Sequence, residues 1–192
     1  NVGGDVVDAE VGGFFVLDSG GPVNIALKDF SSNNTTGFGG PVFSAVQVSR
    51  IAAGNVTVSA GTVHADGFGL AAIDTRAGDV NLSALDVVSG STSLAANLTN
   101  GNVTMTARDL TSTGSPGIVA VNTAGNVTAT VRDASGDGAG ISVSNTTIGN
   151  VSITARNVTA RRLIPGQVPG FASGDAIFLS NNSGTATLDL TG

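Results

Sequence analysis

The chain contains no cysteine, tryptophan or tyrosine, and its 192 residues include a single lysine, Lys28, and a single histidine, His64. Without cysteine it can form neither disulfides nor thiolate metal sites, and one histidine cannot build a zinc site or a catalytic triad alone. Fourteen acidic against eight basic residues give a net charge of −6. The basic stripe that nucleic-acid binding requires is therefore missing, and nucleic acid is not an expected partner.

The sequence also has no apolar run long enough to span a bilayer, no visible signal peptide and no stretch with a clean helical period. Apolar residues make up 41% of the chain, but most of them are alanine and valine. The core must therefore be thin and built from small layers. Abundant Gly, Ser, Thr, Asn and Val favour short strands separated by tight turns.

A short pattern recurs seven times: a glycine, usually Asn or Asp, usually valine, and then alternating Thr/Ser and apolar residues. From Gly54 to Gly149 the copies follow one another at 24, 23, 24 and 24 residues. A fixed period of this size marks a solenoid, because one unit is too small to bury a core without its neighbours. The copies begin at Gly21, Gly54, Gly78, Gly101, Gly125, Gly149 and Gly184.

Three strands are predicted for each coil. The segment 103–107 alternates, with Val103, Met105 and Ala107 inside. A corner at the acidic position eight residues after the glycine, such as Asp109, leads to a short second strand and a Gly-rich bend. The third strand opens with a large apolar residue, at Phe14, Phe43, Leu70, Leu94, Ile118, Ile141 and Ile177. Its fifth position is mostly polar and predicts a column of stacked amides, at Asp18, Gln47, Asp74, Asn122, Asn145 and Asn181.

These features predict an all-β fold: one parallel β-helix domain over residues 1–192, with about seven coils of ~24 residues that rise ~4.8 Å each. The longer stretches 31–42 and 161–176 are predicted to be loop insertions on one side of the solenoid.

The degenerate repeat, as in GNVTMTA from Gly101, resembles the β-helical passenger regions of bacterial surface adhesins of the filamentous-haemagglutinin and autotransporter type. The resemblance covers roughly residues 4–192 and rests on composition and period. It implies a right-handed coil, an extracellular or cell-surface location, and an adhesive or filamentous role. No secretion-domain motif and no Arg-Gly-Asp sequence accompany it.

The chain is expected to start and end with first-strand segments, near Gly4–Val7 and at Ala186–Leu190, and its opening coil to lack the second strand. Open strand edges template further pairing, and an end-to-end contact that does not close gives a filament. We therefore predict head-to-tail assembly with copies of the same chain; the alternative that the ends are cut from a longer solenoid stays open. The predicted subunit interface comprises Val6, Val7, Phe14, Phe15, Leu17, Ala186, Leu188 and Leu190.

Two further surfaces are candidate sites. Outward third-strand positions are unusually apolar and predict an exposed ridge that binds a partner or a neighbouring subunit, with Val46, Ile73, Val119, Val121 and Phe178 as its lateral face. Asn-x-Ser/Thr sequons are more frequent than chance predicts and are candidates for N-glycosylation, although turn chemistry also generates them. The glycosylation candidates are Asn34, Asn55, Asn81, Asn97, Asn102, Asn126, Asn145, Asn150, Asn157 and Asn181.

Asp133, Ser135 and Asp137 have the spacing of the start of a calcium loop, but the acid required at position 12 is replaced by Ser144. A Gly/Asp turn is the competing interpretation, and no cofactor is expected. A column of Asp86, Asp109 and Asp133 would match a polysaccharide-active enzyme, yet corner positions favour turn formation over catalysis. The leading hypothesis is a self-assembling structural protein rather than an enzyme. The alternative is an adhesin segment that binds surface glycans or host proteins through 31–42 and 161–176.

Overall fold

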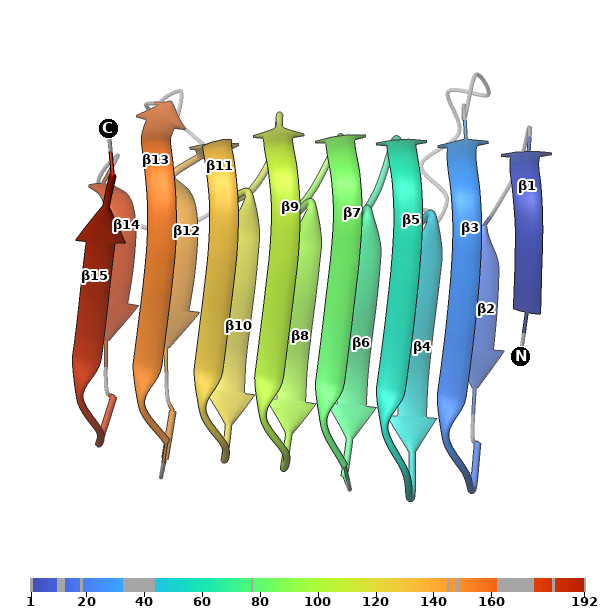
Figure 1. The fold of residues 1–192 in the computed structure, drawn as a ribbon, viewed down its shortest axis with the longest axis horizontal. Helices are drawn as coiled ribbons and strands as arrows, with labels where there is room; N and C mark the ends of the chain where they lie inside the picture. Colours follow the sequence, from blue (N-terminus) through green and yellow to red (C-terminus); the bar gives the residue numbers. More distant parts are fainter. Residues whose placement is uncertain are drawn as a thin grey trace.

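The computed structural model describes residues 2–9, 13–17, 19–32, 44–76, 78–144, 146–147, 149–161, 175–180 and 182–191, with the backbone alone for 2–9 and 32. All regular elements in this part of the chain are strands of two parallel sheets (Figure 1). Sheet A contains, in spatial order, β1 (Val2–Ala9), β3 (Val23–Ser32), β5 (Val56–Ala65), β7 (Val80–Ser89), β9 (Val103–Ser112), β11 (Val127–Asp137), β13 (Val151–Arg161) and β15 (Ala186–Leu190). Sheet B contains β2 (Phe14–Leu17), β4 (Val46–Ile51), β6 (Leu70–Thr75), β8 (Leu94–Thr99), β10 (Ile118–Thr123), β12 (Ala139–Ser144) and β14 (Asp175–Ser180).

The chain alternates between the two sheets and so forms a β-solenoid, which confirms the predicted fold class. In Figure 1 the long strands run upward in front and the short strands downward behind, while the chain advances from right to left. This path makes the coil right-handed. The solenoid has about five turns of regular length, slightly fewer than the seven coils predicted. The regular spacing of 23 or 24 residues holds between the starts of β5, β7, β9, β11 and β13, whereas the steps from β3 to β5 and from β13 to β15 are longer.

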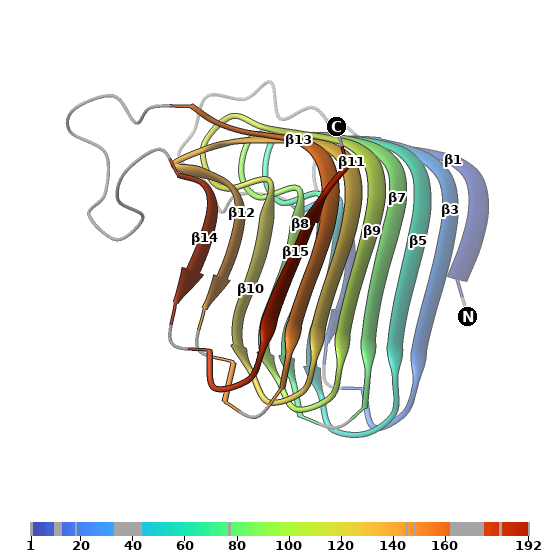
Figure 2. The same cartoon turned by 60° about the vertical axis from the view of Figure 1, so that its left-hand side comes forward.

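Each coil contains two strands where three were predicted, because the first and second predicted strands are one continuous strand. In β9, Ala107 and Leu110 are both buried, whereas Arg108 is exposed and Asp109 is half-buried between them. Two successive outward residues shift the alternation by one and turn the strand without ending it. Figure 2 shows the resulting bend, where all long strands curve over one edge of the solenoid.

The interior consists of apolar columns that run along the axis, as the alternation predicts. Val103, Met105 and Ala107 lie in register with Val127, Ala129 and Val131, and all six are buried. The first column of sheet B contains Phe14, Val46, Leu70, Leu94, Ile118, Ile141 and Ile177. At the first end of the column the Phe14 ring contacts the Phe30 ring, with centroids 6.4 Å apart.

One register prediction is wrong. Val46 and Val48, rather than Phe43 and Ala45, pair with Leu70 and Ala72. Consequently Val46, predicted on the lateral face, is fully buried. The observed register places Ile51 in the core and the charged Arg50 at the corner. This arrangement is lower in energy than one that buries the charge of Arg50 and exposes Ile51. The insertion at 31–42, most of which lies outside the described residues, removed the fixed period by which this strand could have been aligned.

The first strand is also shifted from its predicted register. Val2 pairs with Ile25 and Val7 with Phe30, so β1 lies beside residues 25–32 of β3 on both sides of the bend, and only Val23 and Asn24 at the start of β3 have no β1 partner. The second-strand segment predicted to be absent from the opening coil is therefore present, as Val6–Ala9 beside Asp29–Ser32. The distance to β2 explains the shift: Val2 precedes Phe14 by the same 12 residues that separate Val58 from Leu70.

Candidate functional site

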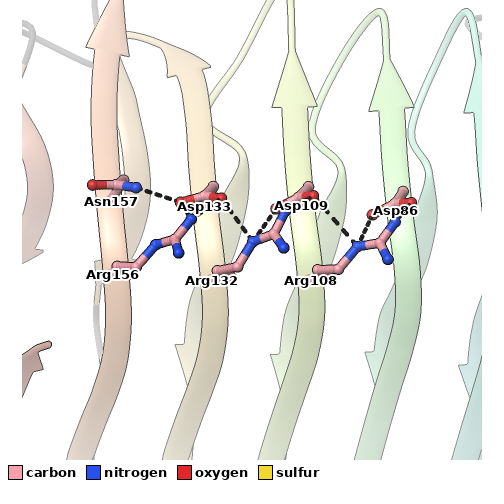
Figure 3. A network of polar contacts seen from close by, with 7 residues as sticks. All are labelled: Asp86, Arg108, Asp109, Arg132, Asp133, Arg156 and Asn157. Atoms are coloured by element: carbon pink, nitrogen blue, oxygen red, sulfur yellow. Dashed lines mark hydrogen bonds and ion pairs between the residues drawn. The ribbon is translucent and has the colours of Figure 1, made fainter. Parts of the chain in front are cut away.

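A ladder of alternating charges follows the bend along the solenoid axis (Figure 3). Asp86, Asp109 and Asp133 stack in register, and each accepts hydrogen bonds from an arginine of the following coil. The Nε atoms of Arg108 and Arg132 lie 2.9 and 3.0 Å from Oδ1 of Asp86 and Asp109. In the last step Arg156 Nη2 lies 3.0 Å from Asp133 Oδ2. The carboxylates predicted to stack are thus bound in a network that links four coils.

Asp133 is the most strongly held member of the ladder. The Asn157 side-chain amide, Arg132 and Arg156 all donate to its carboxylate and, against partial desolvation, lower its pKa to about 2. Such a carboxylate stays ionised and cannot act as the general acid that glycoside hydrolysis requires. A hollow of about 240 Å³ beside Asp109 and Asp133 is lined mostly by these polar groups and by Thr111, Ser135 and Thr159.

The predicted calcium site is wrong. Asp133, Ser135 and Asp137 lie along the extended strand β11, so alternate side chains are spread over about 13 Å. Calcium ligands must all lie about 2.3–2.6 Å from one ion, and side chains spread along an extended strand cannot do so. Among the described residues there is also no cluster of three or more histidine, cysteine or acidic side chains.

A second ladder follows the corner after the repeat glycines from Gly54 onward. The side-chain Oδ1 of Asn55 accepts the backbone N–H of Asp79, and Asp79, Asn102 and Asn126 continue the pattern to the next coil at 2.8–3.0 Å. Asn150 closes the ladder on the N–H of Thr185 at 2.9 Å. The amide column expected at the fifth position of the third strand is therefore found here instead. That fifth position has a left-handed backbone, with φ of 56° at Asp74 and Leu98 and 54° at Asn122.

This ladder involves four of the glycosylation candidates, Asn55, Asn102, Asn126 and Asn150, all of which are exposed. Asn102 and Asn126 also donate their side-chain Nδ2 to the preceding coil at 3.1 Å. Asn157 binds Asp133, and Asn97 accepts from Asn122 at 3.4 Å. Asn81 is half-buried on β7, whereas Asn34, Asn145 and Asn181 lie outside the described residues. The Asn-turn interpretation thus explains the repeat sequons by structure alone, and their modification stays a prediction.

The outward face of sheet B is hollowed rather than ridged. Ala71 and Ala95, although on the outward positions, are buried, and Ile73, Val119 and Val121 are half-buried. A groove of about 340 Å³ crosses β6, β8 and β10, with Phe68 and Pro116 from the preceding turns among its lining residues. Phe178, also predicted on this face, is half-buried on β14. Sequence alternation placed these residues outward but could not reveal that the turns form the groove with them.

The predicted end strands are the outer strands of sheet A. Within the described residues β1 pairs only with β3, and β15 pairs only with β13. The side chains of β15 are exposed along its whole length, with Leu188 and Leu190 48% and 54% exposed. Phe15 and Leu17, on β2 at the first end of sheet B, are 47% and 53% exposed. The side chains of Val6 and Val7 are not among those described.

No protein-family model matches this chain, and comparisons with curated proteins and with solved structures return no match either. The parallel β-solenoid is compatible with β-helical repeat proteins as an architecture. The described part of the chain contains no helix that could cross a membrane.

Proposed function

We propose that the chain is a structural β-solenoid of the cell exterior that joins head to tail with copies of itself into thin fibres. The observation that carries this proposal is the pair of outer strands, β1 and β15, at opposite ends of one parallel sheet. Each has a row of backbone groups that no described strand pairs with, and such edges bind further strands. The likeness of the repeat to filamentous-haemagglutinin-type adhesins supports the same extracellular, filamentous role.

The registers of the two ends are complementary. β15 pairs with Val151–Ala155 and leaves the second half of β13, from Asn157 onward, beside no β15 residue. In β1, Val6–Ala9 occupy the columns of that second half, since Val7 pairs with Phe30 in the column of Val158. A single strand position of sheet A at the junction, called a row, can therefore be filled by β15 of one copy and, further along, by Val6–Ala9 of the next copy. Val2–Gly4 occupy the same columns as Leu188–Leu190 and must leave sheet A for this row to form.

Sheet B continues across the same junction. With β15 and β1 sharing a row, β2 of the second copy lies directly beside β14 of the first. The columns then place Phe14 next to Ile177 and Val16 next to Leu179, so apolar side chains follow apolar side chains inside the solenoid. Continuous burial of this kind is the main stabilising term for stacked repeats.

Electron microscopy of the purified 192-residue chain at rising concentration tests the proposal. We expect thin fibres whose axial repeat is close to one subunit, at about 4.8 Å per row. Short dispersed rods at every concentration would contradict head-to-tail assembly. The adhesin alternative depends on 31–42 and 161–176, most of which lie outside the described residues.

A further inference from the structure

The outward face of sheet B has two columns of side chains with no charged member, and its charged residues, Arg50 of β4, Asp74 of β6 and Asp175 of β14, lie near strand ends beside them. Its two outward columns alternate with the buried columns of the same strands. The first contains Phe15, Gln47, Ala71, Ala95, Val119, Ser142 and Phe178, and the second contains Leu17, Ser49, Ile73, Asn97, Val121, Ser144 and Ser180. The outer side of sheet A, in contrast, bears the whole Asp–Arg ladder. On a chain with a net charge of −6, these two columns form a neutral face.

The centre of this neutral face is the groove over β6, β8 and β10. Its volume of about 340 Å³ is enough for one or two apolar side chains. Ala95 lies in it between the larger Ile73 and Val119, and the lining includes no charged residue. The polar residues among its lining are Ser91, Thr92, Asn97 and Ser115. Such a neutral hollow with few polar groups is suited to an apolar occupant.

Two exposed apolar side chains lie on the same face, in the same two columns. Phe15 and Leu17 of β2 are 47% and 53% exposed, whereas the nearby Ala71 and Ala95 are buried. The other large hydrophobic residues that are exposed among the described ones lie outside these columns: Leu85, Val88, Leu98, Leu188 and Leu190. The face therefore carries both a protruding apolar pair and a hollow lined by apolar side chains.

We infer that this face is a lateral interface between two copies of the chain, in which Phe15 and Leu17 of each copy occupy the groove of the other. Acidic copies repel one another, so contact is favoured where neither contributes charge. The strand order makes the contact reciprocal. When the two solenoid axes run in opposite directions and β4 of one copy faces β6 of the other, β2 of each copy faces β8 of its partner. A reciprocal patch of this kind gives a closed two-fold dimer, not a fibre.

Sedimentation equilibrium of the 192-residue chain tests this dimer. We expect a reversible dimer whose dissociation constant rises at least tenfold, by about 1.4 kcal/mol or more, in the double variant Phe15→Ser/Leu17→Ser and in Val119→Asp. Leu85→Asp is the matched control, because Leu85 is 48% exposed but lies on β7 in sheet A; its dimer should be unchanged. Circular dichroism checks that each variant is folded. A monomer at all concentrations, or equal weakening by Leu85→Asp, overturns the inference.

Disulfide trapping then tests the register, since the chain has no cysteine of its own. Mixed Leu17→Cys and Asn97→Cys chains should form a heterodisulfide, because these residues share a column on β2 and β8. Leu17→Cys mixed with Leu85→Cys should not. Equal yields in both mixtures overturn the face-to-face arrangement. The result is independent of head-to-tail assembly, because a dimer that forms without fibres supports this inference and contradicts only the proposed function.

Discussion

At the scale of single residues, the repeat glycines are fixed by the close approach of neighbouring coils. A Cβ atom on Gly101 would lie 1.9 Å from the carbonyl oxygen of Gly78, and one on Gly78 would lie 2.1 Å from that of Gly54. Gly78 also has a φ of 100°, which side-chain-bearing residues rarely adopt. The obstacle in each case is backbone, which cannot move aside without shifting the ladder.

Gly125→Ala should therefore destabilise the solenoid. The new Cβ would lie 2.4 Å from the carbonyl oxygen of Gly101, and overpacking of this kind lowers the free energy of unfolding by about 1–3 kcal/mol. Urea unfolding followed by circular dichroism measures the change. Gly20→Ala is the control, because no atom lies within 4 Å of a Cβ there. Equal stability of the two variants would show that the corner relaxes freely.

The carboxylate of Asp133 predicts an acid-dependent stability. Its pKa in the folded chain, about 2, lies below the ordinary value of 3.8 because Asn157, Arg132 and Arg156 donate to it. The stabilisation is thus complete above pH 4 and is lost as the pH falls toward 2. When the free energy of unfolding is measured as a function of pH, wild type should lose stability relative to Asp133→Asn as the pH falls from 4 toward 2. Asp137→Asn, on the same strand but outside the ladder, should follow wild type; a wild-type curve parallel to that of Asp133→Asn would refute the prediction.

At the scale of the element, side-chain ladders at two corners hold successive coils in register. Asn126 donates to Asn102 and accepts the N–H of Asn150, so Asn126→Ala removes both contacts. We expect the free energy of unfolding to fall by about 1 kcal/mol and the Asn150 amide to exchange faster with deuterium. Asn81→Ala, away from the corner on β7, is the comparison. If the Asn150 amide exchanges with deuterium at the wild-type rate, water replaces the Asn126 side chain without a loss of stability, and the prediction is wrong.

How far the elements were predictable depended on whether the period was continuous. From Gly54 to Gly149 the alternation placed Val103, Met105 and their equivalents correctly, because one residue of error would have exposed the whole strand. Val46 and the first strand, predicted near Gly4–Val7, were misaligned because both lie beyond breaks in the period. The bend at Arg108–Asp109 was expected as a turn, since sequence does not distinguish two outward residues within a strand from a corner between strands. The groove depends on the turns at Phe68 and Pro116, which have no periodic signal.

At the scale of the whole molecule, the two proposed contacts between copies use different parts of the solenoid. The proposed head-to-tail pairing would use backbone groups at β15, and the proposed lateral pairing would use side chains on sheet B. In a parallel ladder alternate residues bond to opposite neighbours. Thr185 accepts from Val151 and Thr191 donates to Ala155, so the odd-numbered residues of β15 pair with β13. The backbone groups of Ala186, Leu188 and Leu190 therefore face the open side.

Leu188→Pro should accordingly prevent fibre growth and leave the subunit folded. Proline removes the N–H that would pair with the next copy, whereas the bonds from β15 to β13 use the neighbouring residues. Electron microscopy should show short rods in place of fibres, and circular dichroism should match wild type. Thr187→Pro is the informative counterpart, because its N–H faces β13 and its loss should loosen β15 itself. If Leu188→Pro forms fibres as readily as wild type, the open edge of β15 is not the growing end, and head-to-tail strand pairing is not how the chain assembles.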